Sequence, residues 1–322
     1  METLGIDISK RDFHAALIHQ ERTAKKSFPN NSKGFEQLAA WLRNREVTMV
    51  FACMEATGPY WRALATFLFE AGHTVAVVNP KRIKAFAESE LLRVKTDAVD
   101  AALIARFAAS QRPQPWKPLA PEIIELQGLS RHLEFLKRSR AQHVTRAQTP
   151  ELPDWVVNSS EELIAQLDAQ IADLQRAIRE HIDRHPGLKS KRDLLTTIPG
   201  IAHTTAAAII SEMPAIEEFA SVEAVAAYAG LSPQIRQSGS SVRGKPRLCK
   251  TGNARLRKAL FFPAIVGKRH NPTLQALAQR LQTAGKAPMV VVGAMMRKLL
   301  AIAYGVLKSG KPYHPPLTPQ IA

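Results

Sequence analysis

The sequence predicts an α/β domain at the N-terminal end, followed by two regions built mainly from helices. Three observations support this fold class. Strand-like runs open the chain and then alternate with helical stretches over the first 112 residues. Four prolines at residues 113–121 then break the pattern. Beyond them, apolar residues recur at spacings of three and four, which is typical of helices.

Residues 1–112 form the predicted α/β domain. Three short strand-like runs separated by polar turns indicate an antiparallel meander, and a later, nearly continuous apolar run is typical of a strand buried on both faces. The predicted strands are residues 3–8, 13–19, 23–28, 47–53 and 74–78. Helices are predicted at residues 35–42 and 61–71, with two more before the prolines. Three leading strands followed by strand–helix alternation predict a sheet like that of RNase H.

Residues 113–186 contain a proline linker and two long predicted helices. The first helix spans residues 122–148 and repeats leucines every three or four positions. Two prolines follow it, and a second helix with the same alternation runs to Ile182. Such helices can pair as an antiparallel coiled-coil arm, within one chain or between chains.

Residues 187–322 form the third predicted region, which is helical and strongly basic. Its predicted helices include residues 204–213, 254–266, 274–281 and 289–307. No Asp or Glu occurs after Glu223, and the sixteen Lys and Arg residues beyond it account for the whole net charge of +16. Concentrated positive charge is typical of a nucleic-acid-binding protein, because phosphate neutralisation dominates such affinity. A basic protein that is kept soluble by its charge is the alternative.

The composition favours a cytoplasmic protein without a membrane partner. The two cysteines, Cys53 and Cys249, exclude a disulfide framework and fit a reducing cytosol. No signal peptide is visible at the N-terminus. The most apolar run, residues 287–307, is interrupted by Arg297 and Lys298, so a buried helix is predicted there rather than a membrane span.

Four carboxylates of the α/β domain form a candidate metal site. Asp7 lies in the first strand between apolar residues, where a carboxylate is costly unless it binds a cation or hydrogen-bond donors. Glu55 ends the most buried strand, and Asp97 and Asp100 are three positions apart, so a helix places the last two on one face. Hard oxygen ligands on two strands and one helix suit one or two Mg²⁺ ions. Taken singly, each acid also fits a turn, helix-dipole or surface role.

A small polar loop in the basic region, residues 237–245, carries three serines and is a candidate nucleophile loop. A serine hydroxyl is a poor nucleophile unless a base, a metal or cations assist it. Neighbouring cations would neutralise the charge that builds on a phosphoryl group and would contact nucleic acid. The candidate residues are Ser238, Ser240 and Ser241, with Arg236, Arg243, Lys245, Arg247 and Lys250. By itself, Ser-Gly-Ser-Ser is also what a flexible loop looks like, and these patterns do not rank the three hydroxyls.

Two further segments are candidate phosphate contacts. The turn Pro199-Gly200-Ile201 between predicted helices can present backbone N–H groups to a phosphate, or it can simply let two helices pack closely. The first arm helix carries a stripe of cations that includes Arg138 and Arg140, with Glu134 as its single acid. That stripe is either a phosphate-binding face or an ordinary solvated one.

Together these motifs resemble the DEDD insertion-sequence transposases, the insertion-sequence one-ten family that includes the pilin-gene invertase. The matching motifs occur in the family's order and span nearly the whole chain. They are Gly5-Ile6-Asp7, Glu55-Ala56-Thr57-Gly58-Pro59-Tyr60, Lys95-Thr96-Asp97-Ala98-Val99-Asp100-Ala101, Ile198-Pro199-Gly200-Ile201 and Ser238-Gly239-Ser240-Ser241-Val242-Arg243-Gly244. Each motif is unspecific by itself, but the set is characteristic.

The resemblance implies a RuvC-like N-terminal domain that binds Mg²⁺ through Asp7, Glu55, Asp97 and Asp100, and a C-terminal transposase domain with Ser238 as nucleophile. It implies a DNA recombinase of a mobile insertion sequence, guided by a structured bridge RNA that pairs with donor and target DNA. It also implies a homo-oligomer, a dimer or a tetramer, in which the acids of one subunit complete the serine site of another. Such a protein is expected to associate with the nucleoid when it is bound to DNA.

Three functions are therefore to be distinguished. In the recombinase, Ser238 attacks a phosphodiester and forms a phosphoserine link that conserves the bond energy, so strands are rejoined without ATP. In a RuvC-type structure-specific nuclease, the metal activates water and the serine loop only contacts phosphate. In a non-catalytic RNA or DNA chaperone, only the basic surface acts.

Overall fold

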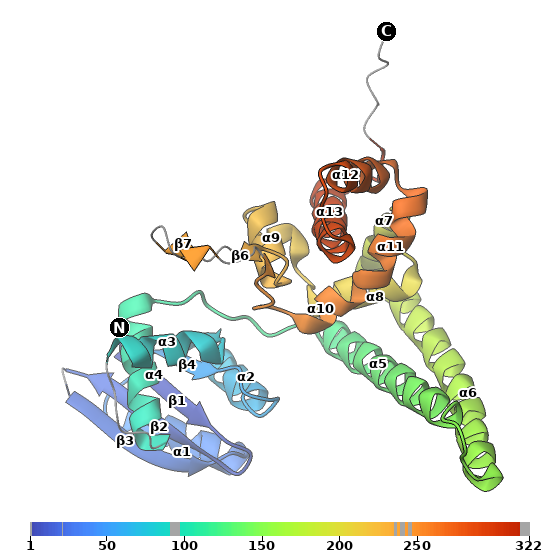
Figure 1. The fold of residues 1–322 in the computed structure, drawn as a ribbon. Coiled ribbons are helices and arrows are strands. Elements are labelled where there is room, and N and C mark those ends of the chain that lie inside the picture. Colours follow the sequence, from blue (N-terminus) through green and yellow to red (C-terminus); the bar gives the residue numbers. More distant parts are fainter. Residues whose placement is uncertain are drawn as a thin grey trace. The chain divides into compact units, whose positions relative to one another are not determined.

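The computed structural model describes residues 2–20, 22–90, 97–234, 237–238, 242–243 and 247–315. For residues 97–98, 237–238 and 242–243 it describes the backbone but not the side chains. The chain divides into two compact units, Met1–Leu119 (unit 1) and Ala120–Ala322 (unit 2) (Figure 1). Unit 1 is mixed α/β and unit 2 is mainly helical, which confirms this part of the predicted fold class.

A five-stranded mixed sheet forms the centre of unit 1. Its strands are β1 (Glu2–Ile8), β2 (Asp12–His19), β3 (Arg22–Pro29), β4 (Val50–Glu55) and β5 (Thr74–Val78). The strand order is β3-β2-β1-β4-β5. The first three strands form the predicted antiparallel meander, whereas β4 runs parallel to both β1 and β5.

Helices cover both faces of this sheet. They are α1 (Ser32–Arg43), α2 (Arg62–Glu70), α3 (Pro80–Ser89) and α4 (Asp97–Gln111). Residues of α1 and α2 share one core cluster with Leu4, Ile6 and Phe13, whereas residues of α3 and α4 share another with Phe51 and Cys53. Alternate residues of β4 therefore face different helices, and this explains why its sequence is apolar without interruption.

Helix α4 and strand β1 approach each other closely in unit 1. A Cβ atom on Gly5 would lie 2.2 Å from both the Ala101 carbonyl oxygen and the Ala105 amide nitrogen. The neighbouring residues are small as well, since Ala16 on β2 is buried against Ala101 and Ala105. Only glycine fits at position 5, because the backbone of α4 occupies the space of a side chain.

Unit 2 begins with a long helical hairpin (Figure 1). Its helices are α5 (Pro121–Ala147), α6 (Asp154–Arg184), α7 (Pro186–Thr196), α8 (His203–Glu212), α9 (Val222–Tyr228), α10 (Ala254–Ala259), α11 (Phe261–His270), α12 (Pro272–Thr283) and α13 (Pro288–Ser309), with a 3₁₀ turn η1 (Ile216–Glu218). The short strands β6 (Pro233–Gln234), β7 (Gln237–Ser238), β8 (Val242–Arg243) and β9 (Arg247–Leu248) lie between α9 and α10. The hairpin consists of α5 and α6, which pack along each other.

The prediction of one helix at residues 254–266 was wrong, because the chain forms α10 and α11 there. Pro263 explains the division. It lies in the first turn of α11, where its missing N–H leaves no intrahelical hydrogen bond unmade. In the middle of a single helix the same proline would remove a bond and clash with the preceding turn.

Helix α13 is long and apolar enough to cross a membrane by length and composition, and half of its most apolar window is buried inside unit 2. Its buried residues include Leu299, Leu300 and Ala303, and the helix packs against α11 and α12. A core helix of this kind has the same composition as a membrane span. The packing therefore favours the buried helix that the sequence predicts.

We expect Gly5→Ala to destabilise unit 1 by about 2 kcal/mol or more, because the added methyl group meets backbone atoms that cannot move independently. Gly128→Ala is the control, since a Cβ at this position of α5 meets no atom within 4 Å and alanine favours a helix by about 1 kcal/mol. Urea unfolding followed by circular dichroism measures both variants. An unchanged unfolding midpoint for Gly5→Ala would contradict the close contact.

Candidate active site

Asp7 and Glu55 lie at the same edge of the sheet in unit 1. In the parallel pair of β1 and β4, Gly5 is opposite Cys53 and Ile6 is opposite Met54. Side chains alternate along a strand, so Asp7 follows Gly5 and Glu55 follows Cys53 on the same face. That face is the one α4 covers, because Gly5 meets the α4 backbone. The register therefore places two carboxylates together at the C-terminal ends of neighbouring strands.

The direction of α4 brings Asp97 and Asp100 toward the same edge. Shortly after this helix, the Trp116 amide donates a hydrogen bond of 2.6 Å to the Val75 carbonyl, near the start of β5. Because β5 runs parallel to β1 and β4, the end of α4 points to the N-terminal ends of the strands. Its first turn, which contains both aspartates, points to the C-terminal ends.

Asp97 and Asp100 lie in the first turn of α4. The Asp97 side chain lies outside the described side chains, whereas Asp100 is half-buried. Among the side chains that are described, no group of three or more His, Cys, Asp and Glu residues is arranged to hold a metal ion. The placement of the four acids at one edge therefore rests on the strand register and on the direction of α4.

The surroundings of Glu55 support its placement on the α4 face. The Thr57 hydroxyl donates a hydrogen bond of 3.2 Å to Glu55 Oε2. Burial raises the pKa of the Cys53 thiol to about 12, with Arg82 opposing the shift and the Glu55 charge adding to it. This shift favours the neutral thiol of Cys53 at neutral pH.

The serine segment forms two short antiparallel ladders where the sequence predicted a loop. Pro233 and Gln234 of β6 pair with Leu248 and Arg247 of β9. Further out, Ser238 of β7 pairs with Val242 of β8. We call these paired strands, β6 to β9, the serine hairpin. The candidate residues Arg236, Ser240, Ser241 and Lys245 lie outside the described residues, and the side chains of Ser238 and Arg243 are not described.

The two ends of the serine hairpin are joined tightly by the backbone. The Cys249 amide donates to the Ser232 carbonyl at 2.9 Å, and the Asn253 amide donates to the Tyr228 carbonyl at 2.7 Å. Gly252 has a φ of +147°, and a Cβ there would lie 2.4 Å from the Tyr228 carbonyl oxygen. A larger residue cannot occupy this position without separating the two ends.

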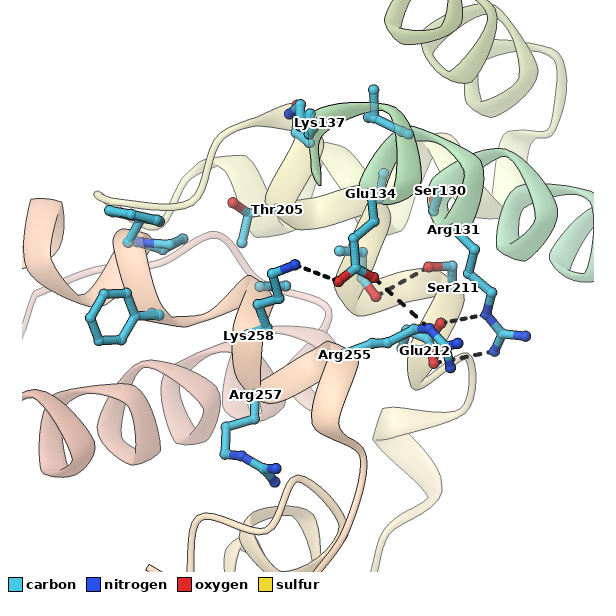
Figure 2. Close-up of a pocket in the computed structure, with 18 of the residues that line it drawn as sticks. Ser130, Arg131, Glu134, Lys137, Thr205, Ser211, Glu212, Arg255, Arg257 and Lys258 are labelled. Atoms are coloured by element: carbon cyan, nitrogen blue, oxygen red, sulfur yellow. Dashed lines mark hydrogen bonds and ion pairs between the residues drawn. The ribbon is translucent and has the colours of Figure 1, made fainter. Parts of the chain in front are cut away.

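The joined ends of the serine hairpin are held against the neighbouring helices by a buried carboxylate, Glu212, which the sequence analysis missed. Figure 2 shows Glu212 beside Arg131. Arg131 donates to both oxygens of Glu212 at 2.8 and 3.3 Å, and Asn253 Nδ2 donates to Glu212 Oε2 at 2.9 Å. The Asn253 side-chain oxygen also caps α10 by accepting from Arg255 N and Leu256 N. This Glu212 cluster (Arg131, Glu212 and Asn253) therefore connects α5, α8 and α10 at the end of the serine hairpin.

The Glu212 cluster also determines the charge state of its carboxylate. The Glu212 side chain is only 7% exposed. Burial is the largest single influence and opposes its ionisation, but the hydrogen bonds from Arg131 and Asn253, together with the charges of Arg131 and Arg255, lower the pKa of Glu212 below its ordinary value. Glu212 is thus ionised at neutral pH, and its charge is paired inside unit 2.

The remaining candidate residues have different surroundings. Arg140 forms an ion pair with Asp168 that joins α5 to α6. A Cβ on Gly200 would lie 2.8 Å from the Pro263 carbonyl oxygen, which supports the helix-packing role for this glycine. Arg247 and Lys250 are exposed at the end of the serine hairpin. Arg138 and Lys250 line a cavity of about 1020 Å³ next to the Glu212 cluster.

Comparisons with known proteins place this chain among transposases. Residues 4–149 match a family model described as transposase, and residues 192–279 match one described as the transposase IS116/IS110/IS902 family. The pilin gene-inverting proteins of Moraxella bovis and Moraxella lacunata are each 34% identical over 313 residues, which is 96% of this chain and 97% of theirs. An uncharacterized 43.6 kDa protein of insertion element IS110 from Streptomyces coelicolor is 26% identical over 160 residues, or 50% of this chain and 38% of its own.

We expect Glu212→Gln to destabilise unit 2 by about 2–3 kcal/mol at pH 7, because Arg131 loses a buried ionic partner. A lowered pKa means that the stabilisation is present above the ordinary carboxyl pKa, about 4.3, and is lost as the pH falls through the folded value. The difference in unfolding midpoint between the native protein and the Glu212→Gln variant should therefore shrink below about pH 4.

Asp168→Asn provides the control for this measurement, because it removes an ion pair that is exposed to solvent. Thermal unfolding between pH 3.5 and 8 compares the three proteins. Little change is expected for the control at any pH, since exposed pairs contribute little. A Glu212→Gln deficit that stays constant over this range would contradict the role of the ionised carboxylate.

Proposed function

This chain belongs to the IS116/IS110/IS902 family of transposases, and we propose that it cuts and rejoins DNA through a covalent phosphoserine on Ser238. Membership makes it a DNA transposase and recombinase. The observation that carries the proposal is the parallel register of β1 and β4, which places Asp7 and Glu55 at one edge of the sheet. A serine on a separately anchored hairpin provides the second half of the chemistry.

The donor set fits Mg²⁺. Asp7 and Glu55 would hold the ion together with Asp97 and Asp100 from the first turn of α4, since carboxylate oxygens are the protein ligands that Mg²⁺ prefers. When bound, the ion would supply stabilisation of negative charge on phosphoryl oxygens. The strand order β3-β2-β1-β4-β5 with an antiparallel β2 supports an RNase-H-like assignment for unit 1.

In the proposed reaction the Ser238 hydroxyl attacks the phosphorus of a DNA phosphodiester. The bond from Ser238 Oγ to phosphorus forms, the bond from phosphorus to the 3′ oxygen breaks, and the hydroxyl proton is passed on to that 3′ oxygen. Arg243, Arg247 and Lys250 on and beside the serine hairpin would neutralise the charge on the phosphoryl group. A 3′ hydroxyl of another strand can then displace Ser238, so the strands are rejoined without ATP.

We propose the partners from the family resemblance and from the charge of the chain. The family resemblance supports a structured guide RNA that pairs with donor and target DNA, and the acid-free C-terminal segment supports contact with its backbone. The functional parts proposed are residues 1–112 for metal binding, 113–186 for the linker and coiled-coil arm, and 187–322 for the transposase domain. We propose a dimer or tetramer in which the acids of one copy complete the serine site of another.

Ser238→Ala is expected to abolish the covalent protein–DNA adduct, because it removes the attacking hydroxyl. Ser240→Ala and Ser241→Ala, two and three positions further along the chain, are the matched controls and should retain the adduct. The protein is incubated with co-purified RNA, donor and target DNA and Mg²⁺, then denatured and resolved by electrophoresis. An undiminished adduct in Ser238→Ala would rule out the serine mechanism. Cleavage without any adduct would instead indicate a RuvC-type, metal-dependent nuclease.

Asp7→Asn is expected to lower DNA cleavage about 100-fold or more while DNA binding is retained, because it removes a metal ligand and leaves the basic surface unchanged. Glu88→Gln, an exposed acid on α3, is the control and should cleave normally. Cleavage assays and fluorescence anisotropy measure the two properties separately. Full cleavage by Asp7→Asn would contradict the role of Asp7 as a metal ligand, whereas DNA binding without any cleavage by the native protein would favour a non-catalytic nucleic-acid chaperone.

A further inference from the structure

A large cavity in unit 2 has no role in the chemistry proposed for Ser238. It measures about 1020 Å³ and lies among α5, α6, α8, α10, α11 and α13, beside the Glu212 cluster (Figure 2). Its floor contains apolar side chains such as Leu133, Ile178 and Met296. Ligand pockets commonly have volumes of about 300–1,000 Å³, so there is room here for a ligand of nucleotide size.

Positive charge surrounds this apolar floor. Nine Lys and Arg residues line the cavity against two glutamates, and both glutamates are already paired. Glu212 pairs with Arg131, and Glu134 accepts from Lys258 at 2.7 Å. Figure 2 shows Glu134 and Glu212 engaged with these neighbouring cations, which leaves a net positive lining.

Several cations of the lining have no acidic partner among the described side chains. These residues are Lys137 and Arg138 on α5, Arg179 on α6 and Lys250 next to the serine hairpin. The protein around Lys137 removes part of its water and lowers the pKa of its ammonium group below the ordinary value. An anion in the cavity would stabilise the charged ammonium group and so offset the cost of this desolvation.

Aromatic and unpaired polar groups complete the lining. Phe262 on α11 is 71% exposed, although it is a large apolar side chain, and its ring lies 5.3 Å from that of Phe261 at a steep angle. The Ser130 hydroxyl on α5 is buried without a hydrogen-bond partner among the described residues. An exposed aromatic surface beside cations is what stacks a nucleic-acid base whose phosphates are neutralised nearby.

We propose that this cavity binds an unpaired nucleotide of the DNA or RNA, with its base against Phe262 and its phosphates near Lys137, Arg138 and Arg179. The inference rests on the proposed function, because strand exchange requires bases to leave their duplex. A paired base is excluded from the cavity, since its faces are covered by its neighbours in the stack. The cavity therefore selects unpaired segments over continuous duplex.

The test uses the full-length Ser238→Ala protein, in which no covalent step interferes. One DNA probe carries a single unpaired 2-aminopurine in an otherwise paired duplex, and a second probe is fully paired. Phe262→Ala should weaken binding of the first probe about tenfold, since stacking of one base contributes about 1–3 kcal/mol, and should leave the second unchanged. Phe262→Tyr should retain most of the affinity. Any change in 2-aminopurine fluorescence that the Ser238→Ala protein causes on binding should be lost when Phe262→Ala is added.

Phe135→Ala is the matched control, because Phe135 on α5 is 62% exposed and does not line the cavity. In addition, Lys137→Ala should reduce the slope of log affinity against log salt by about 1 for the unpaired probe. Equal affinity of native and Phe262→Ala proteins for that probe would overturn the proposal, as would an equal loss for both probes.

Light scattering on the same variants identifies the competing explanation. If Phe262→Ala changes the oligomeric state and leaves probe binding unchanged, the cavity is an interface between copies and the proposal is overturned. This result is separable from the adduct assay. If no Ser238-dependent adduct forms but the protein still discriminates between the two probes through Phe262, the proposed chemistry is rejected and the proposed nucleotide binding in the cavity is retained.

Discussion

The pairing of one buried carboxylate supports the geometry around the serine hairpin. Glu212 accepts from Arg131 on α5 and from Asn253, which also caps α10. Without these donors, burial would make the charged carboxylate unfavourable, and the three helices would lose their common contact. The serine hairpin lies between Tyr228 and Asn253 in the chain, and a backbone hydrogen bond joins these two residues. The position of the hairpin therefore depends on the Glu212 cluster, which contains Asn253.

Unit 1 uses a different constraint to position its acids. Contact between the backbone of α4 and Gly5 brings the helix directly onto β1, and the parallel pairing of β1 and β4 aligns Asp7 with Glu55. Neither the contact of α4 with Gly5 nor the pairing of β1 with β4 depends on the side chains of Asp7 and Glu55. A charged edge can therefore be maintained on a stable apolar sheet, which is the arrangement that a cation-dependent reaction requires.

Local patterns in the sequence predicted much of unit 1 but little of the support in unit 2. The strand predicted at residues 47–53 begins only at Val50. Val47 is apolar because it is buried just after α1, where its amide donates a hydrogen bond to the Leu42 carbonyl. Pairs of two-residue strands such as β7 and β8 are too short to show a period. Glu212 and Arg131 are 81 positions apart, so no local pattern connects them. The available signal was an acid at the end of α8, shortly after the apolar residues 206–210.

Covalent attachment of Ser238 to DNA is the central claim. Its most direct measurement is mass spectrometry of the native protein after reaction with DNA, nuclease digestion and proteolysis. We predict a nucleotide phosphate attached to the peptide that contains Ser238, with fragment ions that assign it to that residue. A modification assigned to Ser240 or Ser241, or the absence of any modified peptide when DNA has been cleaved, would contradict it.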